Sequence, residues 1–343
     1  MFKTFGIRWK EMNSFTYKRA ANEAEAIREV ADNRSAKFLA GGTNLIDLMK
    51  MNVQQPSELV DINRLALKKI ESIPTGLRIG ALATNSEVAN NKLVQEGFPV
   101  LSEALLAGAS PQLRNMATVG GNLLQRTRCY YFMDTAFPCN KRVPGSGCPA
   151  IPGFNRIHAI LGASEHCIAT HPSDMCVALA ALDAVIRVEG PKGARSIAIT
   201  DFHRLPGDTP EIDTNLQPDE LIVSVDLPSS AFAKRSGYLK IRDRAQYAFA
   251  LVSVAAALDI KNGRIEAARI ALGGVAHKPW RSTEAEKVLT GAQSNAQTFK
   301  AAAEAALRGA VPQNHNAFKV ELAKRAIVRI LNDVSGRRVG GAA

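Results

Sequence analysis

The sequence predicts an α+β protein, in which a larger N-terminal region precedes a smaller C-terminal domain of antiparallel strands and helices. One indication is a strand, a glycine turn and a helix start that follow one another over residues 37–51. Another is the order of the C-terminal segments, because runs of strands followed by runs of helices are typical of α+β domains. Pro228-Ser229-Ser230 marks the predicted boundary between the two regions.

Hydrophobic periodicity assigns the elements of the N-terminal region in order. Residues 22–33 read as an amphipathic helix, because their apolar side chains recur at helical spacing. The further predicted helices are 45–51, most of 85–108 with a break at 97–99, and 174–182. Short apolar or alternating runs predict strands; these are 37–40, 59–62, 77–82, 184–188, 196–200 and 221–227.

Residues 110–170 interrupt this pattern. They are rich in Gly, Pro, Cys and Arg and show little periodicity. A long irregular segment inside a compact domain is usually functional or disordered. The cysteines that it contains favour a functional segment.

The C-terminal region reads as an antiparallel sheet covered by helices. Its alternating stretches predict strands at 237–242, 249–260 and 264–275. Helical periodicity follows at 284–289, 296–307 and 318–331. The glycine-rich end of the chain, residues 336–343, is expected to be a flexible tail.

Charge and composition exclude some classes of function. The 343-residue chain has a net charge of +11, but its Lys and Arg residues are scattered and form no aromatic-basic patch. Nucleic acid is therefore not an expected partner. A solvated basic surface and a docking face for an acidic protein both remain open. No apolar run reaches the 18 residues of a membrane span, and the N-terminus lacks a signal peptide's apolar stretch, so neither membrane insertion nor a signal peptide is predicted.

Two diglycine turns are candidates for cofactor binding. The first, residues 40–44, is Ala-Gly-Gly-Thr-Asn, and the second, residues 117–122, is Ala-Thr-Val-Gly-Gly-Asn. Glycine lets the backbone approach a ligand closely, and the N–H groups at a following helix start attract anions. Each turn alone is also what a plain strand-to-helix connection looks like. Two in one region favour a dinucleotide whose pyrophosphate lies between them, although neither has the Gly-x-Gly-x-x-Gly pattern.

Four of the five cysteines lie close together in the irregular segment, at Cys129, Cys139, Cys148 and Cys167. Clustered cysteines in a chain without its own signal peptide favour metal or redox chemistry over disulfides. Their spacing fits neither the paired cysteines of common zinc sites nor the tight runs of ferredoxins. From spacing alone, structural zinc, an iron–sulfur cluster and unligated thiols all stay open. Cys176 lies in an apolar helical stretch and is predicted to be a core residue.

Two charged residues are ambiguous when read alone. Asp174 is a helix-start carboxylate or a ligand for a ribose hydroxyl. Lys240 reads as a solvated lysine on a strand.

Taken in order, five motifs resemble the FAD-binding, medium-type subunit of the molybdenum hydroxylases, the xanthine dehydrogenase family. The motifs are the two diglycine turns, Pro172-Ser173-Asp174, residues 217–222 (Gln-Pro-Asp-Glu-Leu-Ile) and residues 272–276 (Leu-Gly-Gly-Val-Ala). The resemblance covers residues 12 to about 335. Within the family, the cysteine segment is most similar to the flavin subunit of bacterial periplasmic aldehyde oxidoreductases, whose corresponding insertion binds a [4Fe–4S] cluster.

The resemblance implies a fold and a set of site residues. It implies an N-terminal extension (1–11), a two-part FAD-binding domain of the p-cresol methylhydroxylase (PCMH) type (12–229) with an iron–sulfur insertion at about 123–170, and an α+β domain of the CO dehydrogenase flavoprotein type (230–335). Asp174 would bond the ribose, and Ile222 and Lys240 would lie near the isoalloxazine ring. Cys129, Cys139, Cys148 and Cys167 would hold the [4Fe–4S] cluster. The FAD pyrophosphate would be held by Lys37, Phe38, Leu39, Ala40, Gly41, Gly42, Thr43, Asn44 and Leu45, and by Thr118, Val119, Gly120, Gly121 and Asn122.

The resemblance also implies partners. This chain would be the electron-transfer subunit of an aldehyde oxidoreductase and hold no catalytic residue of its own. A large subunit would carry the molybdenum cofactor, a small subunit would carry [2Fe–2S] clusters, and electrons would pass through FAD here to an external acceptor. The expected location is periplasmic, by co-export with a signal-bearing partner, or cytoplasmic. The alternatives are a stand-alone flavin oxidase and a zinc-stabilised interaction module.

Overall fold

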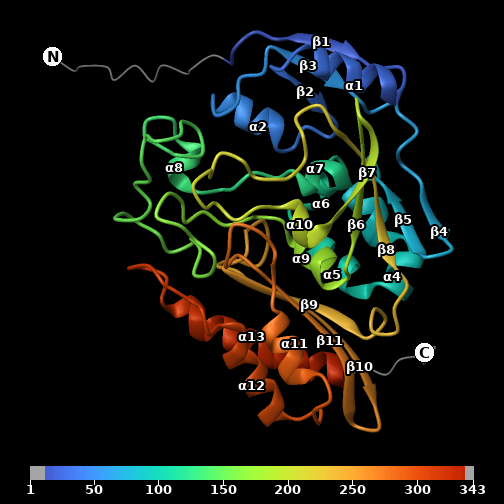
Figure 1. Cartoon of the computed structure of the whole chain (residues 1–343), viewed down its shortest axis with the longest axis vertical. Coiled ribbons are helices and arrows are strands. Elements are labelled where there is room, and N and C mark those ends of the chain that lie inside the picture. The colour runs from blue at the N-terminus through green and yellow to red at the C-terminus, as the bar shows by residue number, and fades with distance from the viewer. Residues whose placement is uncertain (1–11, 337–343) are drawn as a thin grey trace.

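The computed structural model describes residues 12–336 as three blocks stacked along the long axis of the molecule (Figure 1). A small N-terminal sheet lies at one end, a larger sheet with helices in the middle, and the C-terminal domain at the other end. This arrangement confirms the predicted α+β class. The predicted N-terminal extension and residues 337–343 of the predicted tail lie outside the described residues.

The N-terminal block is a three-stranded parallel sheet in the order β1-β3-β2. Its helix α1 begins after Asn22, whose side chain accepts a hydrogen bond from the Glu25 backbone N–H at 2.9 Å. The helix buries Ala26, Ile27 and Val30 against the sheet. The elements of this block are β1 (Thr16–Arg19), α1 (Glu23–Asp32), β2 (Ala36–Leu39), α2 (Leu45–Lys50) and β3 (Glu58–Asp61).

The middle block is a five-stranded antiparallel sheet in the order β4-β5-β8-β6-β7. Its helices other than α6 share one apolar core with the sheet, and α9 is buried along its whole length. The strands are β4 (Ile70–Ile73), β5 (Gly76–Gly80), β6 (Val185–Gly190), β7 (Gly193–Ala198) and β8 (Leu221–Pro228). The helices are α3 (Asn85–Asn90), α4 (Lys92–Gly97), α5 (Pro99–Ala107), α6 (Pro111–Arg114), α7 (Val119–Leu123), α9 (Asp174–Ala181) and α10 (Ile199–Phe202).

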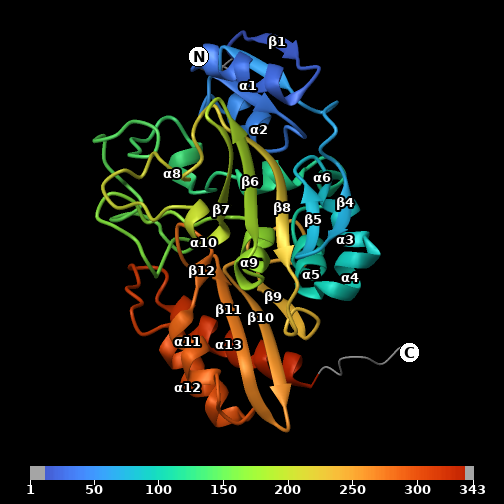
Figure 2. The same cartoon turned by 45° about the vertical axis from the view of Figure 1, so that its right-hand side comes forward.

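Between α7 and α9 the chain makes a long excursion whose one helix is the short α8 (Tyr130–Met133). Its loops lie on one side of the molecule, between the N-terminal sheet and the C-terminal domain (Figures 1 and 2). A small apolar cluster packs inside the loops, and it includes Phe132, Ile168 and the cysteines at 129 and 167.

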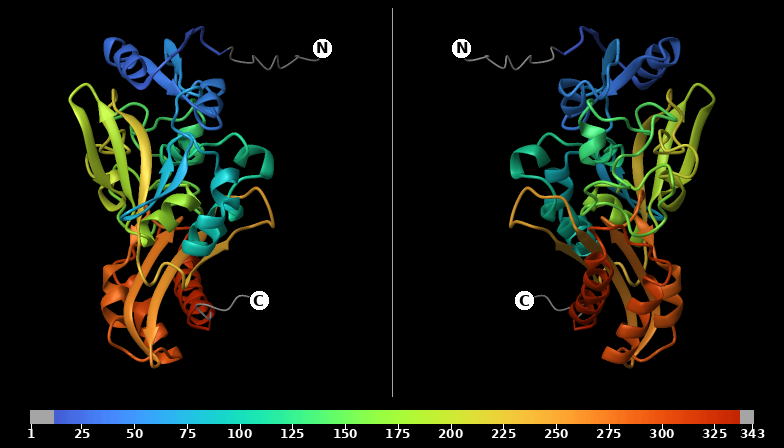
Figure 3. Two further views of the ribbon diagram at one scale, coloured as in Figure 1. Left: turned by 90° about the vertical axis from the view of Figure 1, so that its right-hand side faces the viewer. Right: turned by 90° about the vertical axis from the view of Figure 1, so that its left-hand side faces the viewer.

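The C-terminal domain is a four-stranded antiparallel sheet in the order β12-β11-β10-β9, at the end of the molecule opposite the N-terminal sheet (Figure 3). Successive side chains of β10 point to opposite faces of the sheet. Ala255 packs in the core of the middle block, whereas Val254 and Ala256 pack in the core under the C-terminal helices. The elements are β9 (Ser236–Ile241), β10 (Val252–Lys261), β11 (Arg264–Gly273), β12 (Trp280–Arg281), α11 (Thr283–Leu289), α12 (Ala296–Ala306) and α13 (Phe318–Ser335).

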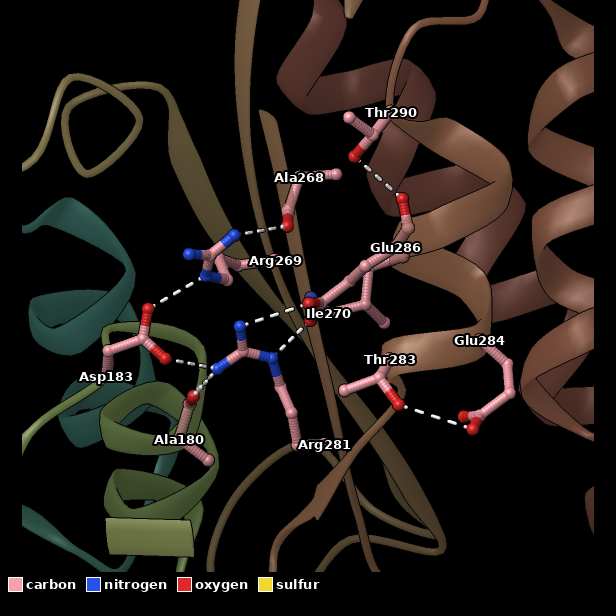
Figure 4. Close-up of polar contacts among 10 residues, drawn as sticks. All are labelled: Ala180, Asp183, Ala268, Arg269, Ile270, Arg281, Thr283, Glu284, Glu286 and Thr290. Carbon is pink, nitrogen blue, oxygen red and sulfur yellow. Dashed lines mark hydrogen bonds and ion pairs between the residues drawn. The ribbon is translucent and has the colours of Figure 1, made fainter. Parts of the chain in front are cut away.

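A charged junction connects the middle block to the C-terminal domain. Asp183, which directly follows α9, accepts from Arg269 at 2.8 Å and from Arg281 at 2.6 Å (Figure 4). Arg281 also donates to Ala180 O at 2.6 Å and pairs with Glu286 of α11. The side chains of Arg281 and Glu286 are only 11% and 12% exposed, whereas that of Asp183 is 39% exposed, so the junction runs from the interior to the surface.

Most predicted elements are present, and several details differ. The predicted strand 196–200 covers only the end of β7, because the chain turns into α10 at Ile199. The irregular segment holds the short helices α6, α7 and α8. Strands β1, β4 and β12 were not predicted. No helix in residues 12–336 combines the length and apolarity needed to span a bilayer.

Candidate functional site

Two adjacent chambers lie in the middle of the molecule. The large chamber has a volume of about 870 Å³ and the small chamber about 430 Å³. Both are lined by Gly42, Thr43, Asn44 and Gln125, so the chambers meet at the first diglycine turn, and we refer to this meeting point as the passage. A single elongated ligand with a bend or linkage at this passage would fill both.

The first diglycine turn needs glycine for steric reasons. A Cβ on Gly41 would lie 1.8 Å from the Met116 carbonyl oxygen, and Gly42 has a φ of +70°. The next side chain, Asn44, accepts from the Arg126 backbone N–H at 3.2 Å, while its buried Nδ2 has no protein partner. A backbone free of side chains and an unpaired buried donor at the passage fit an acceptor-rich ligand such as a dinucleotide.

The second diglycine turn packs behind the first. Gly41 lies against the backbone of Met116 and Ala117, which leads into the second turn. Thr118 caps α7 by accepting from the Gly121 N–H at 3.3 Å. Turns 77 residues apart in the sequence (118 − 41 = 77) thus lie side by side, as a shared cofactor requires.

The residues predicted to hold FAD divide between the chambers. Lys240, Asp174 and Asn122 line the large chamber, and Ile222 lines the small one. Ile222 and Lys240, which are predicted to lie near one ring system, thus line different but adjacent chambers. Val119 points into the apolar core. The remaining predicted residues line the small chamber: Lys37, Phe38, Leu39, Ala40, Gly41, Gly42, Thr43, Asn44, Leu45, Thr118, Gly120 and Gly121.

A buried ion pair forms part of the wall of the large chamber. Lys240 Nζ lies 2.7 Å from Asp174 Oδ2, and the Tyr238 hydroxyl donates to Asp174 Oδ1 at 2.6 Å. Burial, together with the Asp174 charge, raises the pKa of Tyr238 well above its usual value. Both carboxylate oxygens therefore have protein partners, and a ribose hydroxyl would have to share one of them. Sequence reasoning missed Tyr238, although it lies two residues from Lys240 on the same face of β9, where the period of two would have indicated it.

The four predicted cysteines meet in one small pocket. Cys129 and Cys167 are buried and Cys139 and Cys148 are half-buried, and all four thiols are free. Burial raises the pKa of Cys129 to about 12 and that of Cys167 to about 11, and the neighbouring thiols add to the effect. His158 Nε2 lies 3.0 Å from the Cys129 sulfur. Such thiols lose their protons only when a cation takes their place.

The four sulfurs do not gather as closely as the ligands of a single small ion. In residues 12–336, the possible ligand atoms that gather within 4.8 Å of one another are those of His171, Cys176 and His203. No three of the four pocket sulfurs are that close within the same residues. A tetrahedral zinc site with Zn–S bonds of about 2.3 Å holds its sulfurs about 3.8 Å apart. Within residues 12–336 the thiols are therefore not arranged as tetrahedral zinc ligands.

The trio of His171, Cys176 and His203 lies between the chambers and differs from the cysteine pocket. Cys176 is fully buried on α9, as predicted for a core cysteine, and its thiol faces Asn122 O at 4.0 Å. His203 Nε2 donates to Leu123 O at 2.8 Å. Burial lowers the pKa of His203 to about 4 and that of His171 well below its usual value, so both imidazoles are neutral.

Comparison with known proteins agrees with this geometry. The family described as FAD binding domain in molybdopterin dehydrogenase matches residues 13–230, and the CO dehydrogenase flavoprotein C-terminal domain matches residues 237–334. The chain is 53% identical to the aldehyde oxidoreductase FAD-binding subunit PaoB of Escherichia coli, over 93% of this chain and 98% of the relative. It is 31% identical to the glyceraldehyde dehydrogenase medium chain of Sulfolobus acidocaldarius, over 83% of this chain and 84% of the relative. Among solved structures, quinoline 2-oxidoreductase from Pseudomonas putida superposes with a TM-score of 0.74 at 27% identity, covering 95% of this chain and 98% of that one.

Proposed function

The chain belongs to the FAD-binding medium subunits of the molybdenum hydroxylases, and from this membership we propose that it is the electron-transfer subunit of an aldehyde oxidoreductase. Partner subunits with the molybdenum cofactor and [2Fe–2S] clusters would deliver electrons, and an external acceptor would remove them. The choice of aldehyde rests on the relative that is 53% identical along nearly the whole chain. The observation that carries the proposal is the pair of adjacent chambers with the two diglycine turns in their shared wall.

FAD, when bound, supplies the capacity to take up and pass on electrons. The chain's own residues bind and orient it. Gly41 and Gly42 keep the passage clear of side chains, and Asn44 Nδ2 offers a donor there. Lys240 brings a positive charge to the wall of the large chamber, where it would stabilise a flavin that has gained negative charge.

A [4Fe–4S] cluster on Cys129, Cys139, Cys148 and Cys167 is the second part of the proposal. Four thiols without disulfides, spread more widely than zinc requires, are a donor set that suits this cluster. Apolar side chains cover part of the site, with Phe132 and Ala150 almost fully buried beside the cysteines. No other cysteine is available to replace a ligand, because Cys176 lies in a different core.

Absorption spectra and metal analysis of the anaerobically purified complex test both parts. Flavin bands together with iron and acid-labile sulfide would support the whole proposal. Flavin without iron would favour a stand-alone flavin oxidase, particularly if no partner subunits co-purify. Zinc as the sole cofactor would mean an interaction module and would overturn the proposal.

A further inference from the structure

A buried lysine lies on the wall of the cysteine pocket. Lys141, only 1% exposed at its side chain, lines the pocket together with the four cysteines. Its Nζ contacts Asp213 Oδ1 at 2.5 Å, Pro210 O at 2.7 Å and His277 Nε2 at 2.8 Å. An amine buried this completely needs a partner for every N–H.

The hydrogen-bond pattern identifies this group as an ammonium ion. His277 Nδ1 lies 2.8 Å from the Arg204 carbonyl oxygen, which can only accept, so Nδ1 carries the proton. His277 Nε2 is then a lone-pair acceptor that faces Lys141. The three partners of Lys141 are all acceptors, and they match the three N–H donors of –NH₃⁺.

The network around Lys141 keeps a net positive charge. Asp213 is the one carboxylate that the structure places on Lys141, and it also pairs with Arg126 at 2.7 Å. Two cations thus share one anion, while His277 is neutral because burial lowers its pKa to about 4. Lys141 itself is buried, so solvent screens its charge weakly.

This charge reaches the cysteines. Lys141 lines the same pocket as the four sulfurs and lies two residues after Cys139, so its charge is beside any centre that they hold. A centre held by four thiolates is anionic, and reduction by one electron makes it more so. Net charge around an iron–sulfur cluster is one of the factors that set its reduction potential.

We propose that Lys141 sets the reduction potential of the cysteine-held cluster, by placing a fixed ammonium charge beside it that favours the reduced form. This inference rests on the cluster of the proposed function. Lys141 acts through its charge and takes no part in substrate chemistry. Asp213 moderates the effect, because its carboxylate offsets part of the charge.

The test is a potentiometric titration of the anaerobically purified complex, followed by electron paramagnetic resonance, with iron and acid-labile sulfide measured in each sample. Lys141→Met should shift the cluster potential in the negative direction at unchanged iron content. Lys141→Arg keeps the charge and should bring the potential back toward the unsubstituted value. Asp213→Asn should shift it in the positive direction, so the proposal stays testable even if Lys141→Met loses its iron.

Lys278→Met is the matched control, because that half-buried lysine donates to Thr200 O at 2.5 Å and does not line the pocket.

The outcomes separate this inference from the function on which it rests. An unsubstituted complex without iron would refute the cluster itself. A complex with full iron, in which Lys141→Met and Asp213→Asn leave the potential unchanged or move it in the same direction, would overturn the role of Lys141 alone. An equal negative shift in Lys278→Met would also overturn it, because the effect would then not depend on the charge in the pocket.

Discussion

Lys240 and Asp174 form a buried ion pair, with 2.7 Å between Nζ and Oδ2, at the edge of the large chamber. The residues come from different parts of the fold, since Lys240 lies on β9 of the C-terminal domain and Asp174 begins α9. Gly108 makes room for the pair, because a Cβ there would lie 3.2 Å from Asp174 Oδ2. The pair connects the domains and places charge where the cofactor is proposed to bind.

Removing one member of this pair should destabilise the protein strongly. Lys240→Met leaves the Asp174 carboxylate buried with only Tyr238 as partner, and an unpaired buried charge costs about 3–5 kcal/mol. Urea unfolding followed by circular dichroism measures the loss. In the double variant Lys240→Met/Asp174→Asn the charge imbalance is gone, so its cost should be less than the sum of the single ones. A cost of less than about 1 kcal/mol for Lys240→Met would contradict the buried pair.

Adding one methyl group at Gly41 should weaken flavin binding. Gly41→Ala places a Cβ 1.8 Å from Met116 O, so the backbone that joins the two diglycine turns must move apart. We expect a loss of about 1–3 kcal/mol in stability and a lower flavin content after gel filtration. Gly97→Ala is the matched control, since a Cβ there meets nothing within 4 Å and the residue lies in α4. Equal flavin content in the two variants would show that the turn does not need glycine.

Replacing one pocket cysteine should remove iron and spare most of the flavin. Cys139 lines the cysteine pocket but neither chamber, so Cys139→Ser takes away a cluster ligand without changing the FAD walls. Iron, sulfide and flavin per chain are the quantities to measure. Cys176→Ala provides the comparison, because it removes a buried thiol from another core and should keep its iron. If Cys139→Ser retained full iron, its assignment as a ligand would be wrong.

Stability should fall as the pH drops from about 6.5 toward 4. Burial lowers the pKa of His203 and of His277 to about 4, whereas an unfolded histidine titrates near 6.5. In this pH range the two histidines bind protons in the unfolded chain but stay neutral in the native state. Each histidine therefore reduces the free energy of unfolding by up to about 1.4 kcal/mol per pH unit. Above pH about 6.5 the contribution is fully present. Urea midpoints across this range measure the slope, and His203→Gln should flatten it. A slope that His203→Gln leaves unchanged would show that His203 is not buried in its neutral form.

A helix or strand was predictable from the sequence where the periodicity of its apolar residues matches the face that it buries. Helix α1 has its apolar face and its Asn22 cap in the sequence itself. Strand β1 could not be found this way: its four residues, Thr-Tyr-Lys-Arg, are all exposed and are held by parallel pairing with β3, about forty residues away. Such a strand is defined by its partner and leaves little pattern of its own.

The residues of the candidate site, like the elements of the fold, were predictable only where their signal is local in the sequence. The diglycine turns were visible because glycine in a strand-to-helix turn has a local cause. The spacing of the four cysteines left zinc, a cluster and free thiols open, since loop packing brings the sulfurs together. Lys141 carried no signal at all, because Asp213 and His277, which hold it in place, lie 72 and 136 residues further along the chain. Contacts between residues so far apart in the sequence become visible only in the folded structure.

The junction at Asp183 has a mechanical consequence. Bending the C-terminal domain away from the middle block would break the bonds of Asp183 to Arg269 and Arg281 together, and would pull Arg281 from Ala180. These three contacts therefore resist relative motion of the two halves, because one hinge movement has to break all of them together.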